Sequence, residues 1–318
     1  MEEKIKIGVS SCLLGEKVRW NGEHKEDRYV RDMLGKYFQY VSVCPEVEMG
    51  MGVPRETVAL YGSLENPKMI AKSSRRDWAP EMNHFLKERI SALSEDDLSG
   101  YIFKNKSPSC GLWKIPVYSD SRGGKSFQGS GIFANAFVKA FPLIPVEEEG
   151  RLNDPGIREN FIVRVFSFDR LKNALVHHKA NHGALVKFHT QHKYLLLAHS
   201  RKHYTVLGNI VACGKSSSWQ RTLELYITSF METFTVKSTA KKNTDVLLHM
   251  MGFLKKLLPA EDKKNILEVI EDYRRELVPL IVPVTLIQHY VKKYDVKYLQ
   301  DQVYLNPHPK ELMLRNHV

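Results

Sequence analysis

Short apolar runs alternate with polar, Gly-punctuated segments in the first third of the chain, and three of these runs are at residues 4–10, 37–44 and 100–105. The runs read KIKIGVS, YFQYVSVC and GYIFKN, and their β-branched and aromatic residues are typical of strands. Between the second and third runs, residues 78–94 repeat apolar side chains at helical spacing, namely Met82, Phe85, Leu86, Ile90 and Leu93. This order predicts βαβ units, and therefore an α/β domain with a mainly parallel sheet and flanking helices.

The pattern changes in the second half, where helix-forming residues dominate from residue 166 onward. One apolar stripe predicts a helix with a cap at Thr244-Asp245 and a stop near Pro259. Its members are Leu247, Leu248, Met251, Leu254, Leu257 and Leu258. A second helical pattern, over residues 266–294, is expected to break or bend at Pro279 and Pro283. We therefore expect an all-α second domain.

The boundary between the two patterns lies where acidic residues, Gly and Pro cluster, in EEEGRLNDPG at residues 147–156. We expect an α/β domain over residues 1–160 and a helical domain over residues 161–318. The 318 residues are enough for two domains that each bury a core of their own.

The distribution of charged residues also differs between the two halves of the chain. Residues 1–164 hold 24 Lys and Arg against 23 Asp and Glu, whereas residues 165–318 hold 23 against 13. Most of the net charge of +11 therefore belongs to the second half. This asymmetry indicates an anionic partner there, and nucleic acid is favoured because no membrane-insertion signal accompanies it. The alternative is a solvated basic face that only keeps the domain soluble.

The chain has no run of eighteen apolar residues, and its first residues, MEEKIKIGVS, lack the apolar region of a signal peptide. We expect a soluble, cytoplasmic protein without a membrane segment. Its four cysteines are far apart, which is unlike a disulfide-stapled secreted domain. Reduced thiols or metal ligands are expected at Cys12, Cys44, Cys110 and Cys213.

Three of these cysteines follow the predicted strands. Cys12, Cys44 and Cys110 each lie at or just after the C-terminal end of one strand. Loops at the carboxyl edge of an open α/β sheet converge, and ligand sites form there. Three thiols that are distant in sequence are therefore expected to meet at one edge of the sheet.

The local sequence leaves the role of these thiols open. Cys44 precedes a proline and Cys110 precedes a glycine, so both lie on constrained turns, and the nearby Lys104 and Lys106 favour thiolates electrostatically. One reading is that all three cysteines are ordinary buried residues. The other is a metal site with an iron–sulfur cluster or zinc, in which three ligands leave one metal position open for a substrate.

A family resemblance rests on longer motifs. SSCLLG, VRWNG, CPEVEMGMGVPRE, KNKSPSCG and RLNDPGIRENF, in this order, resemble the TudS-like thiouracil desulfidase family over roughly residues 1–165. FHTQHKYLLLAHS, DYRRELVPLIVP and VYLNPHPKELMLRNHV resemble the YbgA-like helical domain. The fusion of the two is similar to the RudS-type tRNA 4-thiouridine desulfidases. Together the resemblances cover nearly the whole chain.

The resemblance implies a [4Fe-4S] cluster held by Cys12, Cys44 and Cys110, with one open iron. That iron would bind the exocyclic sulfur of a thiolated pyrimidine as a Lewis acid, and water would attack the ring carbon. Sulfur would leave as hydrosulfide without net redox change. Within the matched motifs, Glu46 is expected to transfer the proton and Ser107 to orient the substrate through a hydrogen bond, with Ser109 and Glu48 as alternatives.

Further residues are expected to contact the substrate. Arg19 and Asn21 lie in a turn where the family has RYDG and this chain has RWNG, so a charge is missing at Asn21. The full set of candidates is Arg19, Asn21, Arg55, Lys104, Lys106 and Ser109. For the two lysines and Arg55, an exposed solubilising charge is the alternative.

A basic helical domain argues for a substrate larger than free thiouracil, and tRNA that carries 4-thiouridine is the expected partner. Two alternatives remain open. One is a desulfidase of free thiouracil or of thiolated nucleosides and nucleotides. The other is an RNA-binding protein with a structural metal site. The histidine-rich segment 177–203 is expected to contact RNA or to form hydrogen bonds between helices, with zinc as the less favoured alternative.

Overall fold

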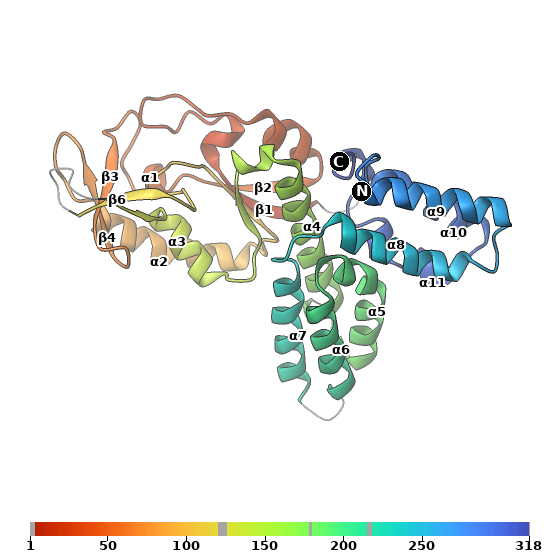
Figure 1. Ribbon diagram of the computed structural model, residues 1–318. Coiled ribbons are helices and arrows are strands. Elements are labelled where there is room, and N and C mark those ends of the chain that lie inside the picture. Colours follow the sequence, from red (N-terminus) through yellow and green to blue (C-terminus); the bar gives the residue numbers. More distant parts are fainter. Residues whose placement is uncertain (1–3, 120–125, 178–179, 215–217, 318) are drawn as a thin grey trace. The chain divides into compact units, whose positions relative to one another are not determined.

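The structure is a computed structural model that describes residues 4–119, 126–177, 180–214 and 218–317. It consists of two compact units, Met1–Ile157 and Arg158–Val318. The division lies within the first turn of helix α4 (Pro155–Leu171), near the boundary that the sequence pattern predicts (Figure 1).

The first unit contains a parallel sheet of four strands in the order β2-β1-β5-β8. The strands are β1 (Ile5–Ser10), β2 (Phe38–Val43), β5 (Tyr101–Phe103) and β8 (Val146–Glu148). Three of them coincide with the runs predicted from the sequence, and all their pairings are parallel. The predicted α/β fold with a mainly parallel sheet is therefore confirmed.

A second sheet of four strands, in the order β4-β3-β6-β7, has no counterpart in the sequence prediction. Its strands are β3 (Val58–Gly62), β4 (Pro67–Ala71), β6 (Ile115–Tyr118) and β7 (Ser126–Gly129). The pairing of β3 with β6 is parallel, and the two outer pairings are antiparallel. This sheet presents the residues that precede β3 to the loops that follow the parallel strands.

Helices α2 (Ala79–Glu95) and α3 (Ile132–Ala140) lie side by side below the strands in the view of Figure 1, and α1 (Pro45–Glu48) is a single turn after β2. The predicted helix at 78–94 is α2. A continuous core joins both sheets to these helices and includes stacked or edge-on rings of Tyr101, Phe103, Phe133 and Phe137. Burial of this aromatic and aliphatic surface drives the unit to fold, at roughly 25 cal/mol per Å² of apolar area.

The second unit is helical, as predicted. Beyond α4 its helices are α5 (His182–His199), α6 (Arg201–Cys213), α7 (Trp219–Thr233), α8 (Ala240–Leu254), α9 (Ala260–Arg274), α10 (Ile281–Lys293) and α11 (Lys297–Gln300). Helix α5 packs on α6, α7 and α8, and α8 packs on α9 and α10. None of the helices in the described part of the chain is both long and apolar enough to cross a membrane.

The predicted start of α8 is wrong. The helix begins at Ala240 because the side chain of Thr239 accepts a hydrogen bond from the amide of Lys242. Thr244, the predicted cap, lies inside the helix, where its hydroxyl donates to the carbonyl of Ala240. The predicted apolar stripe is also only partly buried, since Leu248 is 45% exposed. A hydrophobic period alone did not locate the first turn.

The predicted break in the following helical pattern is partly correct. The chain leaves helix after Arg274 and re-enters it at Ile281, so the break spans Pro279. Pro283 lies in the first turn of α10, where a missing amide hydrogen costs no intrahelical hydrogen bond. This proline therefore starts a helix and does not bend one.

Candidate functional site

The carboxyl ends of three neighbouring strands bring the three cysteines to one edge of the parallel sheet. Strand β1 lies between β2 and β5, and Ser10 at its end pairs with Val43 at the end of β2. Cys12 follows β1, Cys44 follows β2 directly, and Cys110 lies in the loop after β5. The sulfur-bearing loops thus come from adjacent strands.

These loops surround a cavity of about 260 Å³. Among the residues that line it are Cys12, Cys44, Cys110, Glu46, Ser107, Arg19, Arg55, Lys104 and Lys106. Most of the candidates from the sequence therefore share one cavity. Its size suits a small group or one flat ring, because ligand pockets usually start at about 300 Å³.

Cys44 is positioned by the single turn of α1. Its carbonyl accepts hydrogen bonds from the amides of Val47 and Glu48, at 3.1 and 2.9 Å. Its own amide donates to Oε1 of Glu48 at 2.8 Å. The Glu48 carboxylate thus satisfies the amide that precedes the turn, which assigns Glu48 to backbone support of Cys44. Arg89 pairs with the second oxygen of the same carboxylate.

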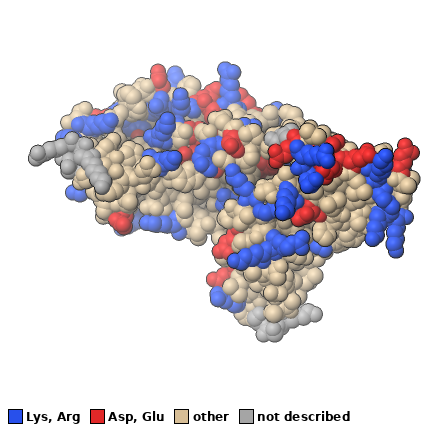
Figure 2. Space-filling view, viewed as in Figure 1, with Lys and Arg blue, Asp and Glu red and all other residues tan. Residues whose placement is uncertain are grey.

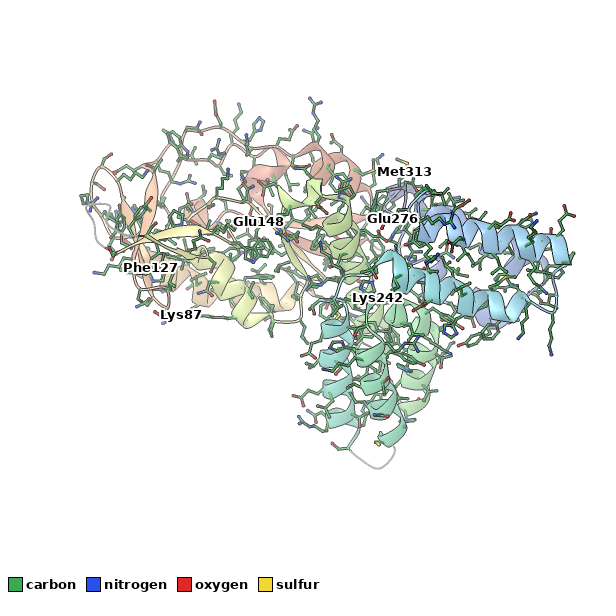
Figure 3. The ribbon with its side chains drawn as sticks, in the orientation of Figure 1. Lys87, Phe127, Glu148, Lys242, Glu276 and Met313 are labelled. Carbon is green, nitrogen blue, oxygen red and sulfur yellow. The ribbon has the colours of Figure 1, made fainter. Side chains whose placement is uncertain are left out.

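The loop that carries Cys110 is held at both ends by two consecutive glutamates at the end of β8. At the start of the loop, Glu149 accepts a hydrogen bond from the amide of Asn105 at 2.7 Å and forms an ion pair with Lys104. At the end of the loop, Glu148 accepts from the amide of Leu112 at 2.8 Å. Both glutamates are buried, and Figure 3 shows Glu148 inside the first unit.

Ser107 organises the middle of this loop. Its Oγ accepts hydrogen bonds from the amides of Ser109 and Cys110, at 3.2 and 3.1 Å. A hydroxyl has one proton to donate in addition, and Ser107 lines the cavity. The packing behind the loop is tight, because a Cβ atom at Gly131 would collide with the carbonyl group of Ser109.

Glu46 is held at both carboxylate oxygens. Arg55 donates from Nε and Nη2 to Oε2, at 2.8 and 2.7 Å, and Ser109 donates from Oγ to Oε1 at 2.6 Å. The side chains of Arg55 and Glu46 are only 5% and 14% exposed. Such paired, charge-assisted hydrogen bonds fix the carboxylate in one orientation at the cavity wall.

Burial dominates the protonation of the three thiols. It raises the pKa of Cys12 to about 12, although Lys104 acts in the opposite direction. Burial also raises the pKa of Cys44 and of Cys110, and each thiolate would further raise the pKa of the others by like-charge repulsion. At Cys12 the positive charge of Lys104 therefore opposes the effect of burial without overcoming it.

The donor set fits a cluster better than a single ion. In the described ranges, no three His, Cys, Asp or Glu side chains are arranged to hold one metal ion. In a cluster each cysteine bonds to a different iron, so the sulfurs need not converge on one point. Three soft donors without disulfide bonds line one cavity, which is the chemistry that iron–sulfur clusters require.

Three of the sequence candidates lie outside the cavity lining, and Glu48 is one of them. Asn21 donates from its side chain to Glu23 in an exposed turn. Ser109 is fully buried behind the wall and reaches the site only through Glu46. One aromatic residue, Trp20, lines the cavity and is 46% exposed.

Sequence reasoning missed several residues of the cavity, among them Ser10, Ser11, Glu56, Thr57 and Asn105. The two serines precede Cys12 directly, so their proximity to that thiol could have been read from SSC. Glu56 and Thr57 come from the chain before β3. No local signal in the sequence brings that segment to the cysteines.

Three histidines of the histidine-rich segment have structural roles. His189, His192 and His199 are buried, and their Nδ1 atoms bond to the hydroxyl of Tyr226 and to the carbonyls of Phe188 and Val236. Burial lowers their pKa values to about 4, 3 and 4, so these rings are neutral at pH 7. His178, in the same segment, lies outside the described residues.

Comparison with known proteins assigns both halves of the chain. Residues 7–149 match the model of a family described as 2-thiouracil desulfurase. Residues 193–309 match a family described as a protein of unknown function, DUF1722. A solved structure of a [4Fe-4S]-dependent thiouracil desulfidase, TudS, is 28% identical and aligns with 48% of this chain and 95% of that chain, with a TM-score of 0.39.

Two curated relatives cover about half of the chain each. The uncharacterized protein YbgA of Escherichia coli (strain K12) is 28% identical over 162 residues, which are 50% of this chain and 94% of YbgA. The uncharacterized protein YbbK of Bacillus subtilis (strain 168) is 31% identical over 153 residues, which are 46% of this chain and 98% of YbbK. The resemblances of the first half to thiouracil desulfidases and of the second half to YbgA are thereby confirmed. The chain belongs to the 2-thiouracil desulfurase family, as a thiouracil desulfidase fused to a YbgA-like helical domain.

Proposed function

We propose that this protein removes sulfur from 4-thiouridine in tRNA, with uridine and hydrosulfide as products and no net redox change. The observation that carries the proposal is the set of three thiols from adjacent strand ends around one cavity, beside a fixed carboxylate. A hydrolytic reaction needs a place for the thiolated ring, a site for water and a group that accepts its proton. The residues of the cavity supply these elements.

Cys12, Cys44 and Cys110 would hold a [4Fe-4S] cluster. When bound, such a cluster with an open iron supplies Lewis-acid activation of the exocyclic sulfur. The raised thiol pKa values agree with this assignment, because cluster formation expels the thiol protons and compensates the buried negative charge.

Glu46 is our candidate for the group that takes the proton of the attacking water. Arg55 and Ser109 hold its two oxygens, so its lone pairs meet the cavity in one geometry. Ser107 accepts two backbone amides and keeps its own proton, which it can donate to an oxygen or nitrogen of the ring. Arg19 and Lys106 place positive charge at the rim of the cavity, where a phosphate of the substrate would lie.

The charge of the helical unit supports a polyanionic substrate. Exposed lysines flank the turn between α8 and α9, namely Lys255, Lys256 and Lys264. Figure 2 shows basic side chains over the visible face of the helical unit and acidic ones gathered along α9. Phosphate contacts of this kind supply affinity without reading sequence, and the thiolated base must also be flipped out of a folded RNA.

The cluster is tested by anaerobic purification with assays of iron, sulfide and desulfurisation. The wild type is expected to contain both elements, and Cys110→Ala is expected to lose them together with activity. Cys213→Ala is the matched control, because that cysteine is exposed in the other unit. A wild type that holds no iron under anaerobic conditions would overturn the cluster assignment.

The tRNA substrate is tested separately with a Lys255→Glu/Lys256→Glu/Lys264→Glu variant. We expect unchanged activity on the nucleoside 4-thiouridine and a loss on tRNA that grows as salt is lowered, because the reversed charges repel phosphates. Equal activity of variant and wild type on tRNA would contradict the assigned role of these lysines.

A second candidate function is desulfurisation of free thiouracil or of a thiolated nucleoside. The small cavity favours it, since about 260 Å³ accommodates one ring without any polymer. A kcat/KM for thiouracil that equals or exceeds the value for tRNA would establish this alternative.

A further inference from the structure

A groove adjoins the cysteine cavity on the side of the second sheet. Its volume is about 680 Å³. Arg55 and Glu56 line both spaces, so the groove and the cavity share a wall. The other lining residues include Met51, Pro54 and Trp78. A molecule that fills the cavity and extends beyond it in this direction therefore enters the groove.

The groove contains a stacked pair of side chains. The guanidinium of Arg76 lies over the indole ring of Trp78, at 3.7 Å from the ring centroid. Arg76 also pairs with Glu81, but its side chain is 54% exposed. An exposed ion pair contributes at most about 1 kcal/mol, so a phosphate can compete for this arginine. The pair thus combines a planar surface for a base with a charge for its backbone.

The segment that carries this pair is braced. Residues 72–78 read KSSRRDW, and the carboxylate of Glu56 accepts hydrogen bonds from the amides of Ser73 and Ser74 at 3.0 and 2.7 Å. Arg75 lies over the ring of Tyr61, with its guanidinium 5.7 Å from the centroid. Glu56 makes the shared wall acidic, so a bound phosphate is expected at the Arg76 end of the groove.

We propose that this groove binds the nucleotide that neighbours the thiolated one in an RNA strand. Its base stacks on the guanidinium plane of Arg76, which Trp78 supports from the other face, while Met51 and Pro54 provide apolar contacts. Its phosphate lies near Arg75 and Arg76. This inference rests on the proposed function, because only a polynucleotide has a neighbour to place there.

Two observations favour this occupant. The cavity and the groove share a wall, so an RNA strand with one flipped base in the cavity would place its next nucleotide in the groove. The basic segment around Trp78 matches the polyanionic backbone. Arginine planes and aromatic rings stack on any base, so the groove adds affinity without choosing a sequence. It would therefore distinguish polynucleotides from free thiouracil.

The kinetic test uses the holoenzyme with two substrates, the nucleoside 4-thiouridine and a five-nucleotide RNA with 4-thiouridine in the middle. Arg76→Ala should lower kcat/KM for the RNA by about 5- to 150-fold relative to the nucleoside, which corresponds to about 1–3 kcal/mol per stacked base. Arg76→Lys should retain only part of the wild-type kcat/KM for the RNA, because an ammonium group has no plane on which a base can stack. Lys87→Ala is the matched control, since Lys87 is an exposed cation on α2 (labelled in Figure 3) and lines neither space.

A binding measurement separates this proposal from the proposed function. The same RNA is prepared with 2-aminopurine on the 5′ or the 3′ side of the thiouridine, and its fluorescence is titrated with enzyme. Stacking should quench one of the two in the wild type and in Lys87→Ala, but not in Arg76→Ala.

Quenching without turnover of the RNA would support the groove and overturn RNA as the substrate. Turnover that is equal in the wild type and Arg76→Ala would overturn the groove alone. Absence of quenching in both RNAs would also overturn it. Unfolding midpoints of the variants confirm that each one is folded.

Discussion

The contacts of Arg55 differ from those expected for an arginine beside a substrate site. An arginine near the site is expected to bind a substrate phosphate, but here Nε and Nη2 both bond to Glu46, and Nη1 bonds to the carbonyl of Gly52. Its guanidinium is therefore a positioning group for the carboxylate. We therefore expect a substrate phosphate to lie near residues with more exposed charge, such as Lys106.

The substitution Arg55→Lys tests whether the two N–H donors of Arg55 are needed to orient Glu46. A lysine keeps the charge but lacks the planar group whose Nε and Nη2 both donate to Oε2, so Glu46 loses its fixed orientation. We expect kcat to fall at least about 10-fold, with unchanged iron content, since a misplaced catalytic group costs up to about 100-fold. Steady-state sulfide release and iron analysis on the same sample measure this. Full activity in Arg55→Lys would show that charge alone is sufficient.

At the scale of elements, the end of β8 acts as a support for the loop after β5. Strands β5 and β8 are neighbours, and the glutamates that follow or end β8 bind both ends of the loop. The loop that carries Ser107 and Cys110 therefore depends on a strand that contributes no residue to the cavity lining.

We expect Glu149→Gln to lower the free energy of unfolding by about 1–3 kcal/mol, because it leaves Lys104, whose side chain is only 15% exposed, without its ionic partner. Urea unfolding monitored by circular dichroism measures this loss. Glu147 bonds to the half-exposed Arg151, so Glu147→Gln is the matched control with an expected loss below 1 kcal/mol. Equal losses in both variants would show that loop support is not specific to Glu149.

The start of α8 gives a second test at this scale. Thr239→Ala should cost about 1 kcal/mol, because it removes the hydroxyl that accepts the amide of Lys242. Asp245→Ala, at the exposed residue of the predicted cap, should change stability by less than 0.5 kcal/mol. Thermal unfolding of both variants decides between the two cap positions.

The elements that could be predicted from the sequence are those with a strong period of hydrophobic residues or a buried apolar stripe. The three parallel strands and α2 have such patterns, and the cysteines at the strand ends pointed to a common site. The second sheet could not be predicted, because β6 contains Pro116 and β7 is exposed over most of its length. Its contribution to the site, Glu56 and Thr57, was missed for the same reason. Side-chain partners such as Arg55 and Glu46 require three-dimensional structure.

At the scale of the whole molecule, the two units differ in their response to acid. Four histidines of the helical unit are buried with lowered pKa values, about 4 for His189, His199 and His308 and about 3 for His192. An unfolded chain takes up protons at these positions below about pH 6.5, whereas the folded chain stays neutral. The contribution of these neutral rings to the free energy of unfolding is therefore fully present above pH 6.5 and is lost as the pH falls toward their lowered pKa values.

We expect each of these histidines to lower the free energy of unfolding by up to about 1.4 kcal/mol per pH unit between pH 6.5 and 4. Hydrogen exchange of peptides from α5, measured at pH values across this window and corrected for the intrinsic rate, reports the loss. His192→Phe should make the dependence shallower, because one protonation site disappears. A free energy that is flat from pH 7 to 4 would contradict the assignment of neutral buried rings.

The position of the cysteines at three parallel strand ends also sets the order of maturation. Parallel strands pair only after long chain segments have closed into loops, so contacts of this kind form late in folding. An emerging polypeptide therefore offers single thiols, and the tridentate scaffold exists only after β1, β2 and β5 have assembled. For the cluster proposed at these thiols, insertion of iron and sulfide would consequently follow folding, and a donor would have to deliver them through the mouth of a finished cavity.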